Sequence, residues 1–108
     1  MTTFDRREQA FENKFMHDQE IQFKIISRRR KLLGLWAAKQ MNMKGEEAEL
    51  YALGIVSYGI DDKREGAVVN HIRDDLEKGG VQVTEEKIRD MMDELHQQAS
   101  REIMEDVR

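Results

Sequence analysis

The chain has 108 residues, of which 39% are hydrophobic and 37% charged, and its formal net charge is −4. This length suits one small domain with a modest core, which rarely also encloses a substrate-sized pocket. The sequence has no cysteine, which excludes disulfides, thiolate catalysis and cysteine-ligated metals, and no proline, the strongest helix breaker.

The first predicted helix runs from about Asp5 to Met43 and has a dense apolar stripe from Ile21 to Met41. Such a helix would be about 58 Å long, whereas a compact body of the remaining residues would be only about 30 Å across. The other helices therefore cannot cover its whole length. Gly34 lies in the strongest part of the stripe, and we expect a close helix–helix contact there.

The N-terminal part of this helix has fewer apolar residues than the rest. Phe4, Phe11 and Phe15 are separated by charged residues, and three rings supply too little burial to offset the ordering of about twenty residues. We expect residues 1–19 to be a docking segment that projects or is mobile in the free protein. Residues 20–108 would form the bundle. The alternative is that the three rings pack against the end of the bundle itself.

Three further helices follow in the sequence. The second is predicted over residues 46–58 and ends at Gly59, and the third is predicted over residues 65–78 and ends at Gly79-Gly80. The fourth begins after Thr84, which is a good N-cap residue because its hydroxyl can accept a hydrogen bond from the first turn. No stretch alternates convincingly with a period of two, so the predicted class is all-α, a four-helix bundle.

The charges are distributed unevenly between the two parts of the chain. Residues 1–44 contain ten basic and five acidic residues, whereas residues 45–108 contain eight basic and seventeen acidic ones. The two parts either attract each other within one bundle or serve different partners. The sequence has no apolar run long enough for a membrane span and no signal-peptide pattern near Met1, so we expect a cytoplasmic protein.

Few residues have the pattern of a catalytic or metal site. The three histidines are far apart, and Asp93 and His96 have the spacing of half a di-metal motif without a second half. We therefore expect no metal, no cofactor and no enzymatic activity. A metal-dependent bundle enzyme is the third hypothesis.

The run Arg28-Arg29-Arg30-Lys31 is the most concentrated positive charge. Four consecutive helical residues cover every face, whereas Lys24, Arg28 and Lys31 share one face. That face could contact a nucleotide, another anion or the chain's own acidic helices, and a small nucleotide-binding sensor is the alternative function. Nucleic acid is not an expected partner, because the net charge is negative and no recognition motif is present.

Several short motifs resemble the zeta subunit family, the inhibitors of the alphaproteobacterial F-type ATP synthase. The resemblance is carried by Thr2-Thr3-Phe4-Asp5, Arg7-Glu8, Lys14-Phe15, His17-Asp18, Phe23-Lys24, Arg28-Arg29, Lys31-Leu32-Leu33-Gly34 and Trp36-Ala37-Ala38. It continues more loosely through Tyr51-Ala52, Asp75-Leu76, Gly80-Val81 and Ile88-Arg89. Two departures are Arg30, where the family commonly has Asn, and Met41-Asn42-Met43, where a Leu-Gly ending is more usual.

The resemblance implies a four-helix fold with a mobile N-terminus and a non-catalytic, regulatory role. It implies that the N-terminal helix inserts at an interface between catalytic subunits of the ATP synthase and blocks ATP hydrolysis more than synthesis. The contacting residues would be Phe4, Asp5, Arg7, Glu8, Phe11, Lys14 and Phe15. The protein would be a monomer when free, would not insert into the membrane, and would lie at the inner membrane only through the synthase.

Overall fold

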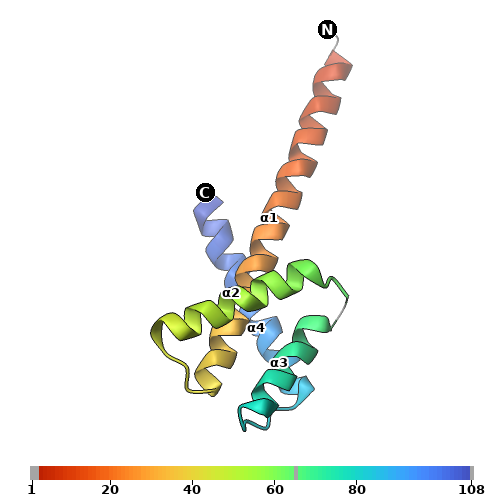
Figure 1. Cartoon of the computed structure of the whole chain (residues 1–108). Coiled ribbons are helices and arrows are strands. Elements are labelled where there is room, and N and C mark those ends of the chain that lie inside the picture. Colours follow the sequence, from red (N-terminus) through yellow and green to blue (C-terminus); the bar gives the residue numbers. More distant parts are fainter. Residues whose placement is uncertain (1–2, 65, 108) are drawn as a thin grey trace.

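The computed structural model describes the backbone of residues 3–64 and 66–107 and the side chains of residues 17–64 and 66–107. Four helices follow one another within these residues (Figure 1): α1 (Thr3–Gln40), α2 (Gly45–Asp61), α3 (Ala67–Lys78) and α4 (Glu85–Val107). The described backbone contains no strand. The predicted all-α class with four helices is therefore confirmed.

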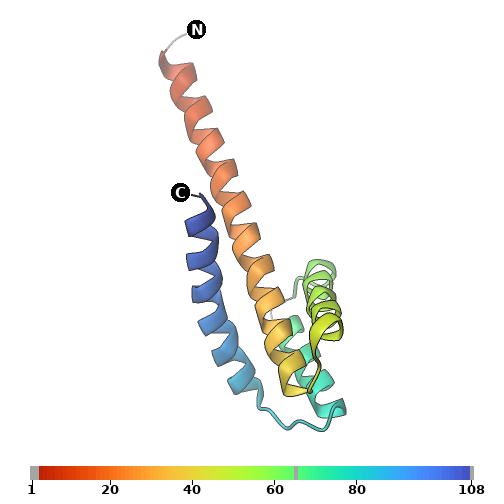
Figure 2. The ribbon, with the colours of Figure 1, turned by 90° about the vertical axis from the view of Figure 1, so that its left-hand side faces the viewer.

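Helix α1 is the axis around which the other three helices are arranged. It contacts each of them, whereas α2 and α4 do not contact each other among the described residues. Figure 2 shows the reason, since α2 and α4 lie on opposite sides of α1. Helix α4 runs antiparallel to α1, and α2 crosses α1 obliquely (Figure 1). The molecule measures 64 × 27 × 21 Å, and its long dimension follows α1.

Helix α1 ends at Gln40, three residues before the predicted end at Met43. Asn42 adopts a left-handed conformation with φ 63°. The amide of Asn42 donates to the carbonyl of Lys39 at 3.1 Å, and the amide of Met43 donates to the carbonyl of Ala38 at 2.9 Å. This pair of bonds is a Schellman motif, which satisfies carbonyls that the helix end leaves free. Asn42 therefore occupies the position that glycine usually fills.

The predicted stop of the second helix at Gly59 was wrong, because α2 continues to Asp61. Gly59 is buried inside the last turn of α2. A Cβ at this position would overlap the guanidinium group of Arg30 on α1. The glycine is therefore a contact position for a side chain of the neighbouring helix rather than a helix terminator.

The ends of α3 and α4 match the sequence more closely. Gly66 has φ 82°, so α3 starts at Ala67 rather than at residue 65. The stop at Gly79-Gly80 is confirmed, because the amide of Val81 donates to the carbonyl of Leu76 at 2.8 Å across a left-handed Gly80.

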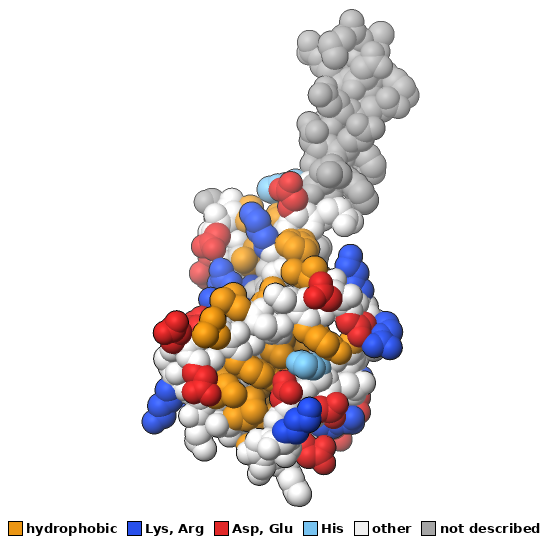
Figure 3. Space-filling model, in the orientation of Figure 1, with side chains coloured by type: hydrophobic (Ala, Val, Ile, Leu, Met, Phe, Trp, Pro, Cys, Tyr) orange, Lys and Arg blue, Asp and Glu red, His pale blue; other side chains and the backbone are white. Residues whose placement is uncertain are grey.

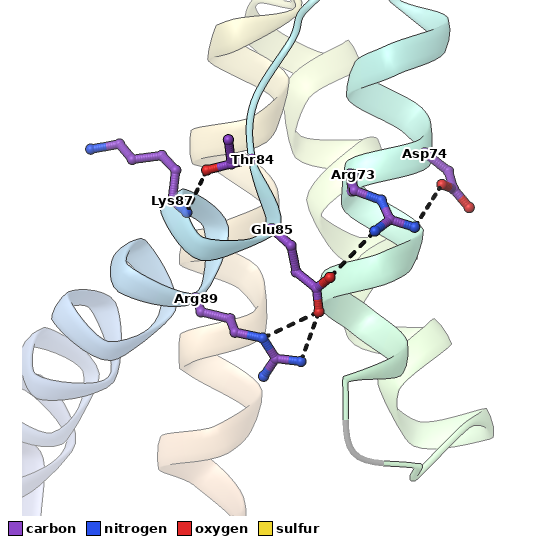
Figure 4. A network of polar contacts seen from close by, with 6 residues as sticks. All are labelled: Arg73, Asp74, Thr84, Glu85, Lys87 and Arg89. Atoms are coloured by element: carbon purple, nitrogen blue, oxygen red, sulfur yellow. Dashed lines mark hydrogen bonds and ion pairs between the residues drawn. The ribbon is translucent and has the colours of Figure 1, made fainter.

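The first turn of α4 is fixed by two polar features, which Figure 4 shows together. The N-cap at Thr84 is confirmed, because its Oγ1 accepts a hydrogen bond of 3.1 Å from the amide of Lys87. In the same turn, the carboxylate of Glu85 lies 3.3 Å from Arg73 of α3 and 3.0 Å from Arg89 of α4. The pair with Arg73 holds the beginning of α4 against α3, and the pair with Arg89 lies within α4.

The core consists of two clusters on opposite parts of α1. The larger joins all four helices and contains Leu33, Ala37, Ile55, Val69, Ile72, Leu76 and Ile88. The smaller lies between α1 and α4 and contains Ile25, Ala99 and Ile103, with Ile21 and Leu32 at its edge. Both clusters bury the apolar stripes that the sequence predicts, and this burial is the main stabilising term of the fold.

Candidate functional site

The candidate docking segment is the part of α1 that extends beyond the other helices. In both ribbon views the N-terminal end of α1 projects past the C-terminus of α4 and past α2 and α3 (Figures 1 and 2). The residues predicted to contact a partner are Phe4, Asp5, Arg7, Glu8, Phe11, Lys14 and Phe15. Their side chains lie outside the described residues, so the structure gives these positions a place on the helix backbone and nothing more.

The first described side chains of α1 show where the helix joins the body. Residues 17–20 are all exposed. Ile21 is the first described side chain that packs against the smaller core cluster, and Ile25 is only 3% exposed. One turn of helix therefore separates a solvent-exposed stretch from a well-packed one.

The basic face of α1 is largely engaged by acids of the other helices. Arg28 Nη1 lies 2.8 Å from Glu102 Oε2 on α4, and Lys31 Nζ lies 3.6 Å from Glu49 Oε2 on α2. The side-chain hydrogen bonds from Gln98 and Arg28 lower the pKa of Glu102. Lys24 is exposed and has no ion pair among the described residues. The opposite charges of the two parts of the chain thus meet within one bundle.

A groove of about 470 Å³ lies along this face, between α2 and α4. Its floor and walls include Phe23, Leu53 and Val107, which are 59%, 52% and 41% exposed. The three basic residues predicted as a possible nucleotide contact, Lys24, Arg28 and Lys31, line it as well. The structure therefore brings these three together, but beside apolar side chains and with two of them already paired. Figure 3 shows hydrophobic side chains exposed on the face that α2 presents.

The three histidines lie in three different environments. His17 is exposed, His71 stacks on Tyr58 with ring centroids 4.1 Å apart, and the Nδ1 atom of His96 lies 3.2 Å from Arg29 Nη1. Within the described part of the chain, no group of three potential ligands could hold a metal ion. Over residues 3–64 and 66–107, no helix combines the length and the apolar character needed to cross a bilayer.

A second polar region was not predicted from the sequence. Arg29 and Arg30 of α1 line a cavity together with Arg64 from the α2–α3 connection and Arg89 of α4. These residues are up to 60 positions apart in the sequence, so no local pattern groups them. The run at residues 28–31 was the only available signal, and its helical spacing argued against a single patch.

The chain matches a protein-family model over most of its length. A model of the family described as ATPase inhibitor subunit zeta matches residues 1–102. No curated protein matches the chain significantly. The match includes the projecting part of α1, all of α2 and α3, and most of α4.

Proposed function

The chain belongs to the ATPase inhibitor subunit zeta family, and we propose that it inhibits ATP hydrolysis by inserting the docking segment, residues 1–19, between catalytic subunits of an F-type ATP synthase. The family description makes its role that of an inhibitor, which is regulatory rather than catalytic. The partner interface and the mode of inhibition are the parts that the proposal adds.

The shape of α1 is the observation that carries this proposal. The helix is continuous from Thr3 to Gln40, yet its N-terminal end extends past the other three helices in both views (Figures 1 and 2). The first described side chain of α1 in a core cluster is Ile21. A projecting helix can reach into a cleft between two subunits while its C-terminal half stays anchored in a folded body.

The composition of the segment fits insertion into a protein interface. Positions 4, 8, 11 and 15 are spaced by four, three and four residues, which is the spacing of one helix face. Three of these four residues are phenylalanine, and burying each ring would contribute roughly 1.5–3 kcal/mol. An amphipathic helix in an apolar groove is an established recognition mode. The remaining predicted contacts, Asp5, Arg7, Glu8 and Lys14, would then select the partner through charge.

The body would act as an anchor that resists displacement of the docking segment. The pairs Arg28–Glu102 and Lys31–Glu49 tie α1 to the helices on both of its sides. A rotary enzyme passes through several conformations, and a ligand that binds one of them more tightly shifts the population toward it. Inhibition of this kind needs no catalytic residue. The protein would be monomeric when free and would lie at the inner membrane only through the synthase.

The alternative function, a nucleotide sensor on the basic face of α1, has less support. Arg28 and Lys31 already pair with Glu102 and Glu49, and the groove beside them is lined largely by apolar side chains. A phosphate would therefore have to displace two ion pairs.

The proposal is tested by adding the full chain to membranes that have been stripped of their own inhibitor subunit. ATP hydrolysis and ATP synthesis are then assayed separately. We expect hydrolysis to fall as the protein saturates its site, with synthesis reduced much less. An equal loss of both activities, or no loss of either, would contradict the proposed mode of inhibition.

A further inference from the structure

A cavity next to Arg29 shares no lining residue with the groove beside Lys24, Arg28 and Lys31, and none of its lining residues belongs to the docking segment. It measures about 290 Å³ and is bounded by α1, the α2–α3 connection, the start of α3, and α4. Its polar lining is formed by Arg29, Arg30, Asp62, Lys63, Arg64 and Arg89. We call it the arginine pocket. Five of these six side chains are positively charged.

The acids of the described residues neutralise only part of this charge. The single carboxylate of the lining, Asp62, is bound by Arg64 through both guanidinium hydrogen bonds, which lower its pKa to about 2. Arg89 pairs with Glu85, as Figure 4 shows. Arg29, Arg30 and Lys63 have no carboxylate within 4.0 Å among the described residues.

Arg29 and Arg30 are also partly withdrawn from water. Both are half-buried, and the Nε atom of Arg29 is covered and has no hydrogen-bond partner. Burial and the neighbouring Arg30 lower the pKa of Arg29 against the opposing charge of Asp93, and burial lowers the pKa of Arg30. The fold therefore holds two adjacent cations in surroundings that disfavour their charge. A bound anion would reverse that penalty.

The remaining contacts of the two side chains fix their positions. Arg29 donates toward Nδ1 of His96 on α4, at 3.2 Å. Arg30 lies across Gly59 in the last turn of α2. Both guanidinium groups are thus held at the cavity by groups on other helices. A preorganised site loses less entropy on binding than a flexible one.

We infer that the arginine pocket binds a small tetrahedral oxyanion of the phosphate or sulfate class. Guanidinium groups offer paired N–H donors in a planar fork that matches two oxygens of such an ion. The cavity is at the lower limit for a drug-sized ligand, so an ion with a few waters suits it better. The bound ion would join α1, α4 and the α2–α3 connection. None of these residues belongs to the docking segment, so the inference is independent of the proposed function.

Inorganic phosphate is the probe that tests this inference. The full chain is titrated with phosphate, and with sulfate in a second series, at constant ionic strength in chloride, and amide shifts in NMR spectra are followed. We expect a saturable response centred on residues around the pocket. Removal of one charge-assisted contact should weaken binding about tenfold or more, so R30Q and R64Q are each expected to lose that much affinity.

The control is R101Q, which makes the same charge change at an exposed position of α4 outside the pocket, and which should leave affinity unchanged. If R30Q fails to fold, R64Q still tests the inference. The Arg64 side chain is 82% exposed, so its replacement should not disturb the fold. Non-saturable shifts of equal size in all variants would overturn the inference.

Discussion

Gly34 of α1 lies directly against Ala52 of α2, so closely that a Cβ at Gly34 would stand 2.7 Å from the Cα of Ala52. This confirms the close approach that the sequence predicted. The obstructing atom belongs to the backbone, so it cannot move aside like the end of a flexible side chain. Gly34 and Ala52 therefore set the distance between α1 and α2.

We expect Gly34→Ala to destabilise the protein by roughly 1–3 kcal/mol, because the overpacking outweighs the higher helix propensity of alanine. The free energy of unfolding in urea measures this effect. The matched control is Gly54→Ala in α2, where a Cβ would meet nothing within 4 Å. That variant should gain about 0.5–1 kcal/mol from propensity alone. Stabilisation by both substitutions would contradict the described α1–α2 contact.

Replacement of Asn42 tests the left-handed ending of α1. Alanine tolerates φ 63° less well than asparagine, so Asn42→Ala should cost about 1 kcal/mol. Asn70 is exposed within α3, and the same substitution there should be neutral or stabilising by a few tenths of a kcal/mol because of helix propensity. Thermal denaturation of the two variants would show opposite shifts. A shift of the same sign and size would argue against the Schellman motif at Asn42.

The two tyrosines of α2 differ in how they contact α3. Tyr51 donates a hydrogen bond of 2.8 Å to Asp75 Oδ2, and burial raises the pKa of Tyr51. Tyr58 instead stacks its ring on His71. Tyr51→Phe should destabilise the protein by about 1–2 kcal/mol, because Asp75 loses the hydrogen bond from the hydroxyl and keeps the 3.3 Å contact of the same oxygen with His71 Nε2. Tyr58→Phe keeps the ring and should be close to neutral, and equal losses would argue against the Tyr51–Asp75 bond.

The Arg28–Glu102 pair predicts a dependence of stability on pH. The pKa of Glu102 in the folded protein lies below its ordinary value of 4.5, so its contribution is complete above pH 4.5 and is lost as the pH falls through the folded value. We expect Glu102→Gln to lose stability at neutral pH and to show a shallower decline below pH 4.5. Glu105→Gln, at an exposed position one turn along α4, is the control. Parallel pH profiles for Glu102→Gln and the unsubstituted chain would contradict this assignment.

Local sequence signals predicted the helices and several of their ends. Apolar spacing identified all four helices, and Thr84 and Gly79-Gly80 predicted caps because these motifs act within a few residues. The predicted helix end at Gly59 was wrong for a different reason. A glycine is present there because Arg30 from another helix packs against it, and this contact cannot be read from the local sequence. The arginine pocket was missed for the same reason. Arg30 and Arg89 line the same cavity because of the tertiary fold and not because of any spacing in the sequence.

The docking residues remain a prediction, because the side chains of Phe4 to Phe15 lie outside the described residues. The sequence suggested them by composition and by family resemblance. The fold adds the projection of α1 and the first packed side chain at Ile21. The contacts of the segment also depend on the surface of its partner, which the sequence of this chain does not contain.

The most direct test of the docking mechanism replaces Phe4, Phe11 and Phe15 together with alanine in the full chain. Inhibition of ATP hydrolysis is measured on membranes stripped of their own inhibitor subunit, with Phe23→Ala as the control, because Phe23 is 59% exposed on the body. We predict that the triple variant keeps its helical fold but needs at least a tenfold higher concentration to inhibit hydrolysis to the same extent. Phe23→Ala should inhibit at the same concentration as the unsubstituted chain. Full inhibition by the triple variant would contradict the account.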